Sequence, residues 1–196
     1  MFPFLLIFIV YICILTYYSK KGSANQKKVT EEFWEKERQS NAIRKKDISQ
    51  LNYITIPLEK FPQKFNTTSE ETFFSFEKKP MLNLTGISNT DLKLSYGTAN
   101  LTVLSEYDTN YTDMISILPQ YALELTELGE TDTAKVLLEF GISTNADSSK
   151  IYKQLADIYH AEGNEHKIKE LLEKAETLPT YIKNAIQKEL SAYTLS

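Results

Sequence analysis

The side chains that most often carry out chemistry in proteins are scarce in this 196-residue chain. Its two histidines are His160 and His166, and its one cysteine, Cys13, lies within an apolar run at the N-terminus. A structural zinc site needs about four Cys, His or carboxylate ligands, and a Cys–His catalytic pair needs a cysteine close to a histidine. We therefore expect neither a metal site nor a cysteine-based active site.

The acidic residues and the glycines do not form a catalytic pattern either. Glu31–Glu32 and Glu70–Glu71 are consecutive, and consecutive residues of a helix do not face each other. The six glycines are scattered singly, whereas a phosphate-binding loop needs several in a short stretch. The sequence therefore predicts a protein that is not an enzyme and that binds no cofactor.

Composition and charge favour a folded helical protein. Hydrophobic residues make up 42% and charged residues 24% of the chain, which is ordinary for a folded domain, and only six Gly and six Pro disfavour a turn-rich β fold. Residues 20–80 hold 13 basic and 9 acidic side chains, whereas residues 81–196 hold 9 and 17. The acidic C-terminal part would be repelled by phosphates, so no nucleic-acid partner is expected.

The N-terminal run over residues 2–18 carries no charge. As a helix, these 17 residues span about 26 Å, close to the ~30 Å of a bilayer core. We expect a single transmembrane helix over residues 1–19. Aromatic and basic side chains are typical of the ends of such a helix, and the expected membrane-interface residues are Tyr17, Tyr18, Lys20 and Lys21.

Basic residues follow this run and none precedes it, which predicts a single-pass membrane protein with its N-terminus outside and its C-terminal domain in the cytoplasm. The alternative is a cleaved signal peptide ending near the small residues 22–24, but no basic region precedes the run. The richness in Lys, Asn, Ile and Tyr is typical of an AT-rich bacterial genome.

Two segments connect this helix to the rest of the chain. Residues 20–47 form a basic juxtamembrane linker and helix, in which Trp34 either inserts at the membrane interface or packs on the domain. Residues 48–87 give mixed signals: Tyr53–Pro57 is an extended run stopped by proline, and residues 68–76 form one short helix, capped by Thr68 or Ser69.

Residues 88–196 contain an internal repeat. Two short helices, 89–96 and 98–107, come first, separated by Gly97. Residues 112–177 then match themselves at an offset of 34 residues at nine positions. The matching pairs are Asp113/Asp147, Ile117/Ile151, Gln120/Gln154, Ala122/Ala156, Gly129/Gly163, Lys135/Lys169, Leu137/Leu171, Leu138/Leu172 and Glu139/Glu173. A period of this length suits two helices and two turns.

The matched residues suit such a hairpin. The alanine pair is small where helices must approach closely, Gly129 and Gly163 suit left-handed turns, and the aspartate pair can cap the first helix of each unit. Pro119 should kink the first helix or delay its start. A last helix over residues 181–193, with Ile182, Ile186 and Leu190 turned inward, would cover the end of the array.

The repeat resembles the tetratricopeptide-repeat family. The signature positions of that family are matched by Leu118, Tyr121, Ala122, Leu125, Gly129, Ala134, Leu138 and Gly141 in the first unit and by Tyr152, Leu155, Ala156, Tyr159, Gly163, Leu172 and Ala175 in the second. The expected fold class is therefore all-α, with an N-terminal transmembrane helix, a short tetratricopeptide-like α-solenoid of helix hairpins, and a C-terminal capping helix.

The resemblance implies a protein partner held in a groove formed by the first helix of each hairpin. The groove positions transferred by register are Leu123, Thr126, Lys150, Lys153, Asp157 and His160. Asp157 stands where relatives that bind carboxylate tails carry asparagine, which disfavours that ligand. The expected function is a membrane-tethered adaptor or scaffold with an unknown partner; the alternative is a structural or assembly subunit of a larger membrane complex.

Overall fold

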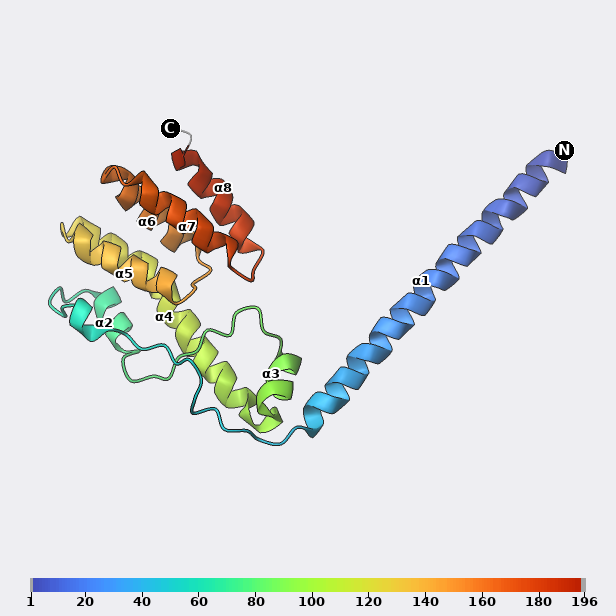
Figure 1. The fold of residues 1–196 in the computed structure, drawn as a ribbon, viewed down its shortest axis with the longest axis horizontal. Coiled ribbons are helices and arrows are strands. Elements are labelled where there is room, and N and C mark those ends of the chain that lie inside the picture. The colour runs from blue at the N-terminus through green and yellow to red at the C-terminus, as the bar shows by residue number, and fades with distance from the viewer. Residues whose placement is uncertain (1, 195–196) are drawn as a thin grey trace. The chain divides into compact units, whose positions relative to one another are not determined.

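The computed structural model describes residues 2–194, without the side chains at positions 2, 3, 5, 6, 24, 25 and 194. The fold over this range is all-α, as expected, and contains no strand (Figure 1). Contacts divide the chain into two compact units. The first comprises residues up to 46 together with 88–101, and the second comprises residues 47–87 together with those from 102 onward.

The longest element of the first unit is α1 (Phe2–Ala42), a helix of 41 residues. The sequence predicted an apolar helix, a linker and a polar helix in this region, and the three are one continuous element. The reason is that the expected linker holds a single helix-disfavouring residue, Gly22. One glycine inside a helix costs only about 1 kcal/mol relative to alanine.

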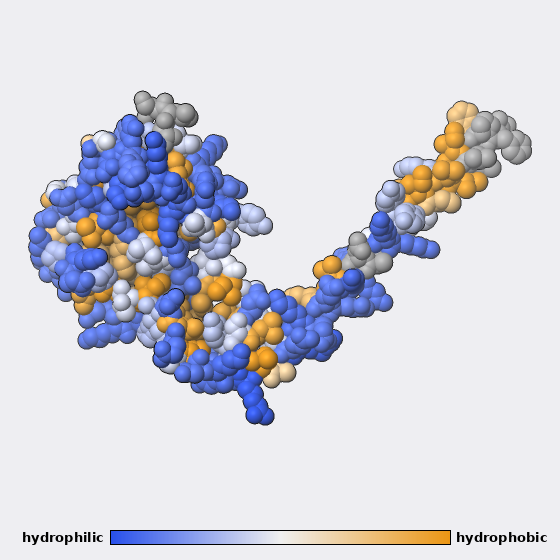
Figure 2. Space-filling model, in the orientation of Figure 1, coloured by the Kyte–Doolittle hydropathy of each residue, from blue (hydrophilic) through white to orange (hydrophobic). Residues whose placement is uncertain are grey.

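The prediction of a transmembrane anchor is wrong. Across the described residues, no helix combines the length and the apolar character needed to cross a membrane, so the expected single-pass topology with a cytoplasmic C-terminal domain is withdrawn. The apolar side chains gather in the N-terminal part of α1 (Figure 2), and Lys20 and Lys21 end the run after 17 residues, or about 26 Å. Met1 lies outside the described residues.

The residues expected at a membrane interface all lie on α1 with exposed side chains. Tyr17, Tyr18, Lys20 and Lys21 are exposed on α1. Trp34 is 56% exposed. Among the described residues, the one aromatic ring that contacts it is that of the neighbouring Phe33, which lies edge to face at 5.4 Å between ring centres.

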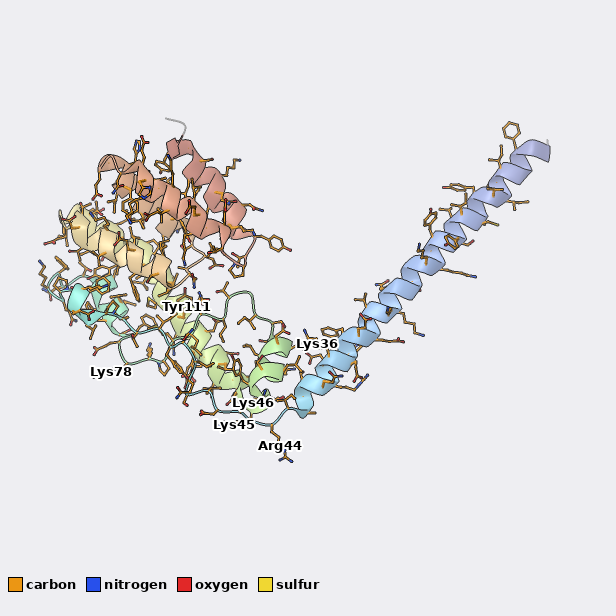
Figure 3. All side chains as sticks on the ribbon, viewed as in Figure 1. Lys36, Arg44, Lys45, Lys46, Lys78 and Tyr111 are labelled. Atoms are coloured by element: carbon orange, nitrogen blue, oxygen red, sulfur yellow. The ribbon has the colours of Figure 1, made fainter. Side chains whose placement is uncertain are left out.

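Charged side chains join α1 to α3 (Asn89–Tyr96) within the first unit. Lys93 donates to Glu37 at 2.8 Å, and the Thr90 hydroxyl donates to the same carboxylate. These two hydrogen bonds lower the pKa of Glu37. Figure 3 shows Lys36 beside α3, where its ammonium lies 2.7 Å from the Asp91 carboxylate.

The segment after α1 is held by close backbone packing. Gly97 follows α3 with φ +86°, and a Cβ added to it would lie 2.3 Å from the carbonyl oxygen of Arg44. The side-chain amide of Asn100, in the short 3-10 helix η2 (Thr98–Asn100), donates to the carbonyls of Lys46 and Tyr96 at 2.8 and 2.7 Å. Residues 44–46, labelled in Figure 3, are therefore fixed through their backbone.

The second unit is a stack of helices, of which the last five are joined by short turns (Figure 1). Its helices are α2 (Thr68–Phe74), α4 (Leu101–Glu127), α5 (Thr131–Ser143), α6 (Ser149–Ala161), α7 (Glu165–Glu176) and α8 (Ile182–Thr194). The turns α4–α5 and α6–α7 contain Gly129 and Gly163 with φ +81° and +69°, which confirms the predicted left-handed turns. Ala122 and Ala156 are 2% and 0% exposed, as expected for close helix contacts.

The first hairpin differs from the prediction at its start. Asp113 was expected to cap the first helix, and the expected short helix 98–107 was to end before it. Instead Asp113 and residues 101–107 fall within α4, which runs for 27 residues and passes through Pro119, whereas residues 98–100 form η2. The N-cap of α6 is Ser148 rather than Asp147. In α8, Ile186 and Leu190 are buried as predicted, whereas Ile182 is 41% exposed.

Residues 47–66 have no regular structure apart from a turn of 3-10 helix, η1 (Leu58–Lys60). This strap is fixed by Glu70 of α2, whose buried carboxylate accepts the backbone N–H groups of Lys64, Phe65 and Asn66. The strap places Ile56 and Phe61 in the core. The cap of α2 is Thr67, one residue before the positions expected.

Candidate binding groove

A small cavity of about 130 Å³ opens between α4, α5 and α6. It is lined by Ala122, Leu123, Thr126, Leu138, Gln154, Asp157 and Ile158. Ligand pockets for whole small molecules have volumes of about 300–1,000 Å³, whereas one water occupies about 30 Å³ in the liquid. The cavity therefore has room for one side chain of a partner rather than for a complete small molecule.

The apolar lining follows from the spacing of the repeat. Ala122 and Leu138 are buried and form the floor, and Ile158 of α6 is half-buried. Leu123 is 47% exposed at the rim. An exposed leucine beside a hollow offers apolar surface that a bound chain would remove from water at about 25 cal/mol per Å².

Gln154 joins the two hairpins at the bottom of the groove. Its amide nitrogen donates to the carbonyl oxygen of Pro119 at 3.1 Å. Its amide oxygen is buried and accepts no hydrogen bond from any described residue. A buried acceptor without a donor costs about 1–3 kcal/mol, so this oxygen marks a place where a donor from a partner would be favourable.

The polar rim of the groove is shared with α8. The Tyr193 hydroxyl donates to the Asp157 carboxylate, and its ring lies edge to face on His160 at 5.6 Å between ring centres. Burial, followed by the hydrogen bond to Asp157, raises the pKa of Tyr193 to about 12. At neutral pH the phenol is therefore protonated and remains a donor to Asp157.

The structure brings three of the six predicted groove residues to one cavity. Leu123, Thr126 and Asp157 line it, as the register of the repeat implied. His160 lies one turn further along α6, against Tyr193. Lys150 and Lys153 are exposed on α6 and do not line the cavity.

Sequence reasoning missed three residues of the groove. Gln154 was recognised only as one half of the Gln120/Gln154 repeat pair, and the repeat did give a signal that its position is special. Ile158 follows the apolar spacing of a core-facing helix, which gives no signal for a groove position. Tyr193 gave no signal, because the contact between the last helix and the groove depends on how α8 packs.

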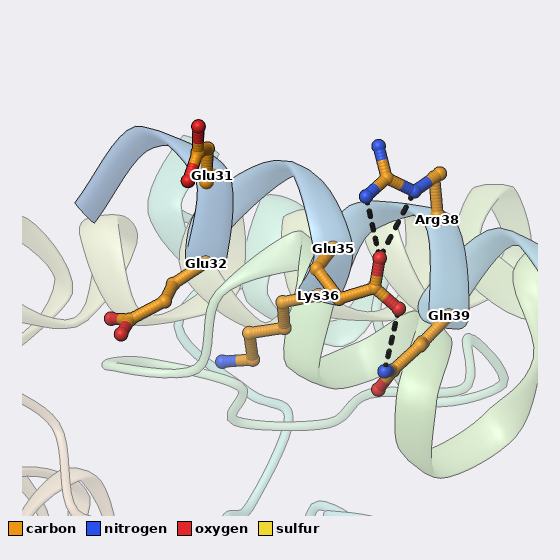
Figure 4. Close-up of a pocket in the computed structure, with 6 residues that line it drawn as sticks. All are labelled: Glu31, Glu32, Glu35, Lys36, Arg38 and Gln39. Atoms are coloured by element: carbon orange, nitrogen blue, oxygen red, sulfur yellow. Dashed lines mark hydrogen bonds and ion pairs between the residues drawn. The ribbon is translucent and has the colours of Figure 1, made fainter. Parts of the chain in front are cut away.

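Two other hollows are less suited to a specific ligand. One, of about 590 Å³, runs along α1 and is lined only by residues of that helix (Figure 4). There Arg38 and Gln39 both donate to Glu35, so this carboxylate is already paired. The second, of about 400 Å³, lies over α5, α6 and α7, where Lys167 pairs with Glu170.

Within the described part of the chain, no three His, Cys, Asp or Glu residues lie close enough to hold a metal ion. Comparison with known proteins found no matching family model, no matching curated protein and no matching solved structure.

Proposed function

We propose that this chain is a protein-interaction module, an adaptor or scaffold, that binds an extended segment of a partner in the groove between α4 and α6. In this proposal the hairpins α4–α5 and α6–α7 are two tetratricopeptide-like units, and α8 caps the array. The observation that carries the proposal is the cavity at the predicted groove, which is lined by the exposed Leu123 and by Gln154, whose buried amide oxygen has no donor among the described residues.

Packing elsewhere supports this choice. The buried faces of α4–α8 join one continuous core, so the hairpins do not depend on a partner to cover their apolar surface. The apolar faces of these helices are thus covered within the chain, and the small cavity is the part of their surface that is left for a partner. Extended peptides bound to helical repeats occupy sites of this kind, where a few side chains carry most of the binding energy.

The test is site-specific photo-crosslinking in the full chain. A benzophenone amino acid at Leu123 should form a discrete adduct with one partner segment, which mass spectrometry would map to the same few residues in replicate experiments. The matched control is the same probe at Leu128, which is equally apolar and 55% exposed, but outside the cavity. Equal adducts at both positions, or none at Leu123, would reject the groove.

A second function is favoured by one observation. Apolar side chains are exposed along α1, among them Phe4 and Phe8 at 79% and 61%. An exposed apolar surface of this extent marks an interaction site, which would suit a subunit of a larger assembly. Size-exclusion chromatography of the full chain, purified from its native source, separates the two proposals. A monomeric chain would exclude the proposal that it is a subunit of a larger assembly.

A further inference from the structure

The unmatched polar atoms of the groove are acceptors. The Gln154 oxygen is buried and without a donor among the described residues. The Asp157 carboxylate accepts one bond, from Tyr193, and that bond reaches only its Oδ1 atom. The nearby Thr126 hydroxyl already donates to the Ala122 carbonyl at 2.8 Å. A side chain that enters the cavity therefore has to donate hydrogen bonds.

The remaining walls are aliphatic. Leu123 and Ile158 line the path from the rim to the floor at Ala122 and Leu138. A lysine or arginine side chain combines an aliphatic stem with a cationic group that only donates. Its stem would pack between the two aliphatic side chains, and its head would reach Asp157 and Gln154. A carboxylate or a carbonyl in the same place would meet two acceptors and be repelled.

The net charge of the surrounding region also favours a basic ligand. Residues 81–196, which contain the groove, hold 17 acidic against 9 basic side chains. Long-range attraction of this kind raises the encounter rate of a basic segment. Lys150 and Lys153 lie on the preceding turns of α6, so they would disfavour a second basic residue at that end of the groove and help to set the direction of the bound chain.

We infer that the groove between α4 and α6 selects a segment of a partner protein by one lysine or arginine side chain, which inserts between Leu123 and Ile158 and bonds to Asp157 and Gln154. The inference rests on the proposed function, because it specifies the partner of the same groove.

The test is selection of random twelve-residue peptides, displayed on phage, against the full chain and its variants. The unmodified chain should enrich peptides with Lys or Arg at one fixed position. Asp157→Lys should replace this preference with Asp or Glu. Asp157 is exposed, so this variant is expected to fold. Glu173→Lys on α7 is the matched control, because it changes the net charge equally at an exposed position that does not line the cavity, and it should keep the Lys or Arg preference.

The strength of the contact can be measured on a selected peptide. Replacing its Lys or Arg by norleucine keeps an aliphatic stem and removes the cation. Because a hydrogen bond to a charged group contributes about 1.5–3 kcal/mol in proteins, binding should weaken roughly tenfold or more, as read by fluorescence anisotropy. Gln154→Leu should reduce the difference between the two peptides.

The outcomes separate the two proposals. Selected peptides that depend on Leu123, but show no basic preference or keep it in Asp157→Lys, would overturn the inference and leave the proposed groove standing. No selected peptide at all would overturn both.

Discussion

Gln154 of α6 connects two helices and still has an unmatched atom. Its amide donates to the Pro119 carbonyl on α4, so the side chain is held in one orientation. The oxygen then faces away from that bond and has no donor among the described residues. A residue fixed in this way is a preorganised acceptor, so its own side chain has little conformational entropy left to lose on binding.

Titration of the Tyr111 hydroxyl predicts how the free energy of unfolding depends on pH. Burial raises its pKa to about 12, and its hydroxyl donates to the Thr144 carbonyl at 3.1 Å. The ordinary tyrosine pKa is about 10. Because the folded-state pKa is the higher one, the contribution to stability is complete below about pH 10 and is lost as the pH rises toward about 12, by up to about 2–3 kcal/mol.

Urea unfolding of the full chain at about pH 9 and pH 11 measures this effect. Tyr111→Phe should lower the free energy of unfolding at pH 9 by about 1 kcal/mol through the lost hydrogen bond, and it should show a smaller loss between the two pH values than the unmodified chain. The other tyrosines whose pKa is raised by burial keep part of the loss in the variant; they are Tyr53, Tyr121, Tyr152, Tyr159 and Tyr193. An identical loss in both proteins would contradict the assignment to Tyr111.

At the level of the element, the connection after α3 makes a close backbone contact within the first unit. Gly97 has φ +86°, and its Cα faces the carbonyl of Arg44 so closely that a Cβ has no room. Backbone atoms cannot move aside as a flexible side chain can. The packing of α3 against residues 44–46 therefore depends on this one glycine.

Gly97→Ala should release α3 from this contact. The positive φ alone costs an alanine about 1–2 kcal/mol, and the overlap adds to it. Hydrogen exchange of the α3 amides in the full chain should become at least tenfold faster. The control is Gly22→Ala, where a Cβ would meet nothing within 4 Å; this change should leave α3 exchange unaltered and stabilise α1 by up to about 1 kcal/mol. Unchanged exchange in Gly97→Ala would show that the contact is not required.

At the scale of the whole molecule, the sequence predicted the repeated part best. The glycine turns, the buried alanines and most of the helices of the second unit follow from local periodicity and from an offset of 34 residues. These features are local, because each turn and each apolar stripe is encoded within a few residues. The groove residues Leu123, Thr126 and Asp157 came from the same register.

The sequence predicted the other parts poorly because they depend on contacts between distant segments. The carboxylate of Glu70 was considered only as half of a consecutive pair, yet it fixes the strap through three backbone N–H groups. Tyr193 reaches Asp157 across 36 residues. The transmembrane prediction failed for a different reason. The charge-free run over residues 2–18 is close to the thickness of a bilayer core but does not reach it.

The central claim is that a partner segment occupies the groove between α4 and α6. Its most direct test is the NMR spectrum of leucine and isoleucine methyl groups in the full chain, titrated with a peptide selected on that chain. We expect the shifts to concentrate at Leu123, Leu138 and Ile158, while the methyl groups of Ile168 and Leu171 on α7 stay unchanged. Shifts confined to α7, to α8 or to α1 would contradict it.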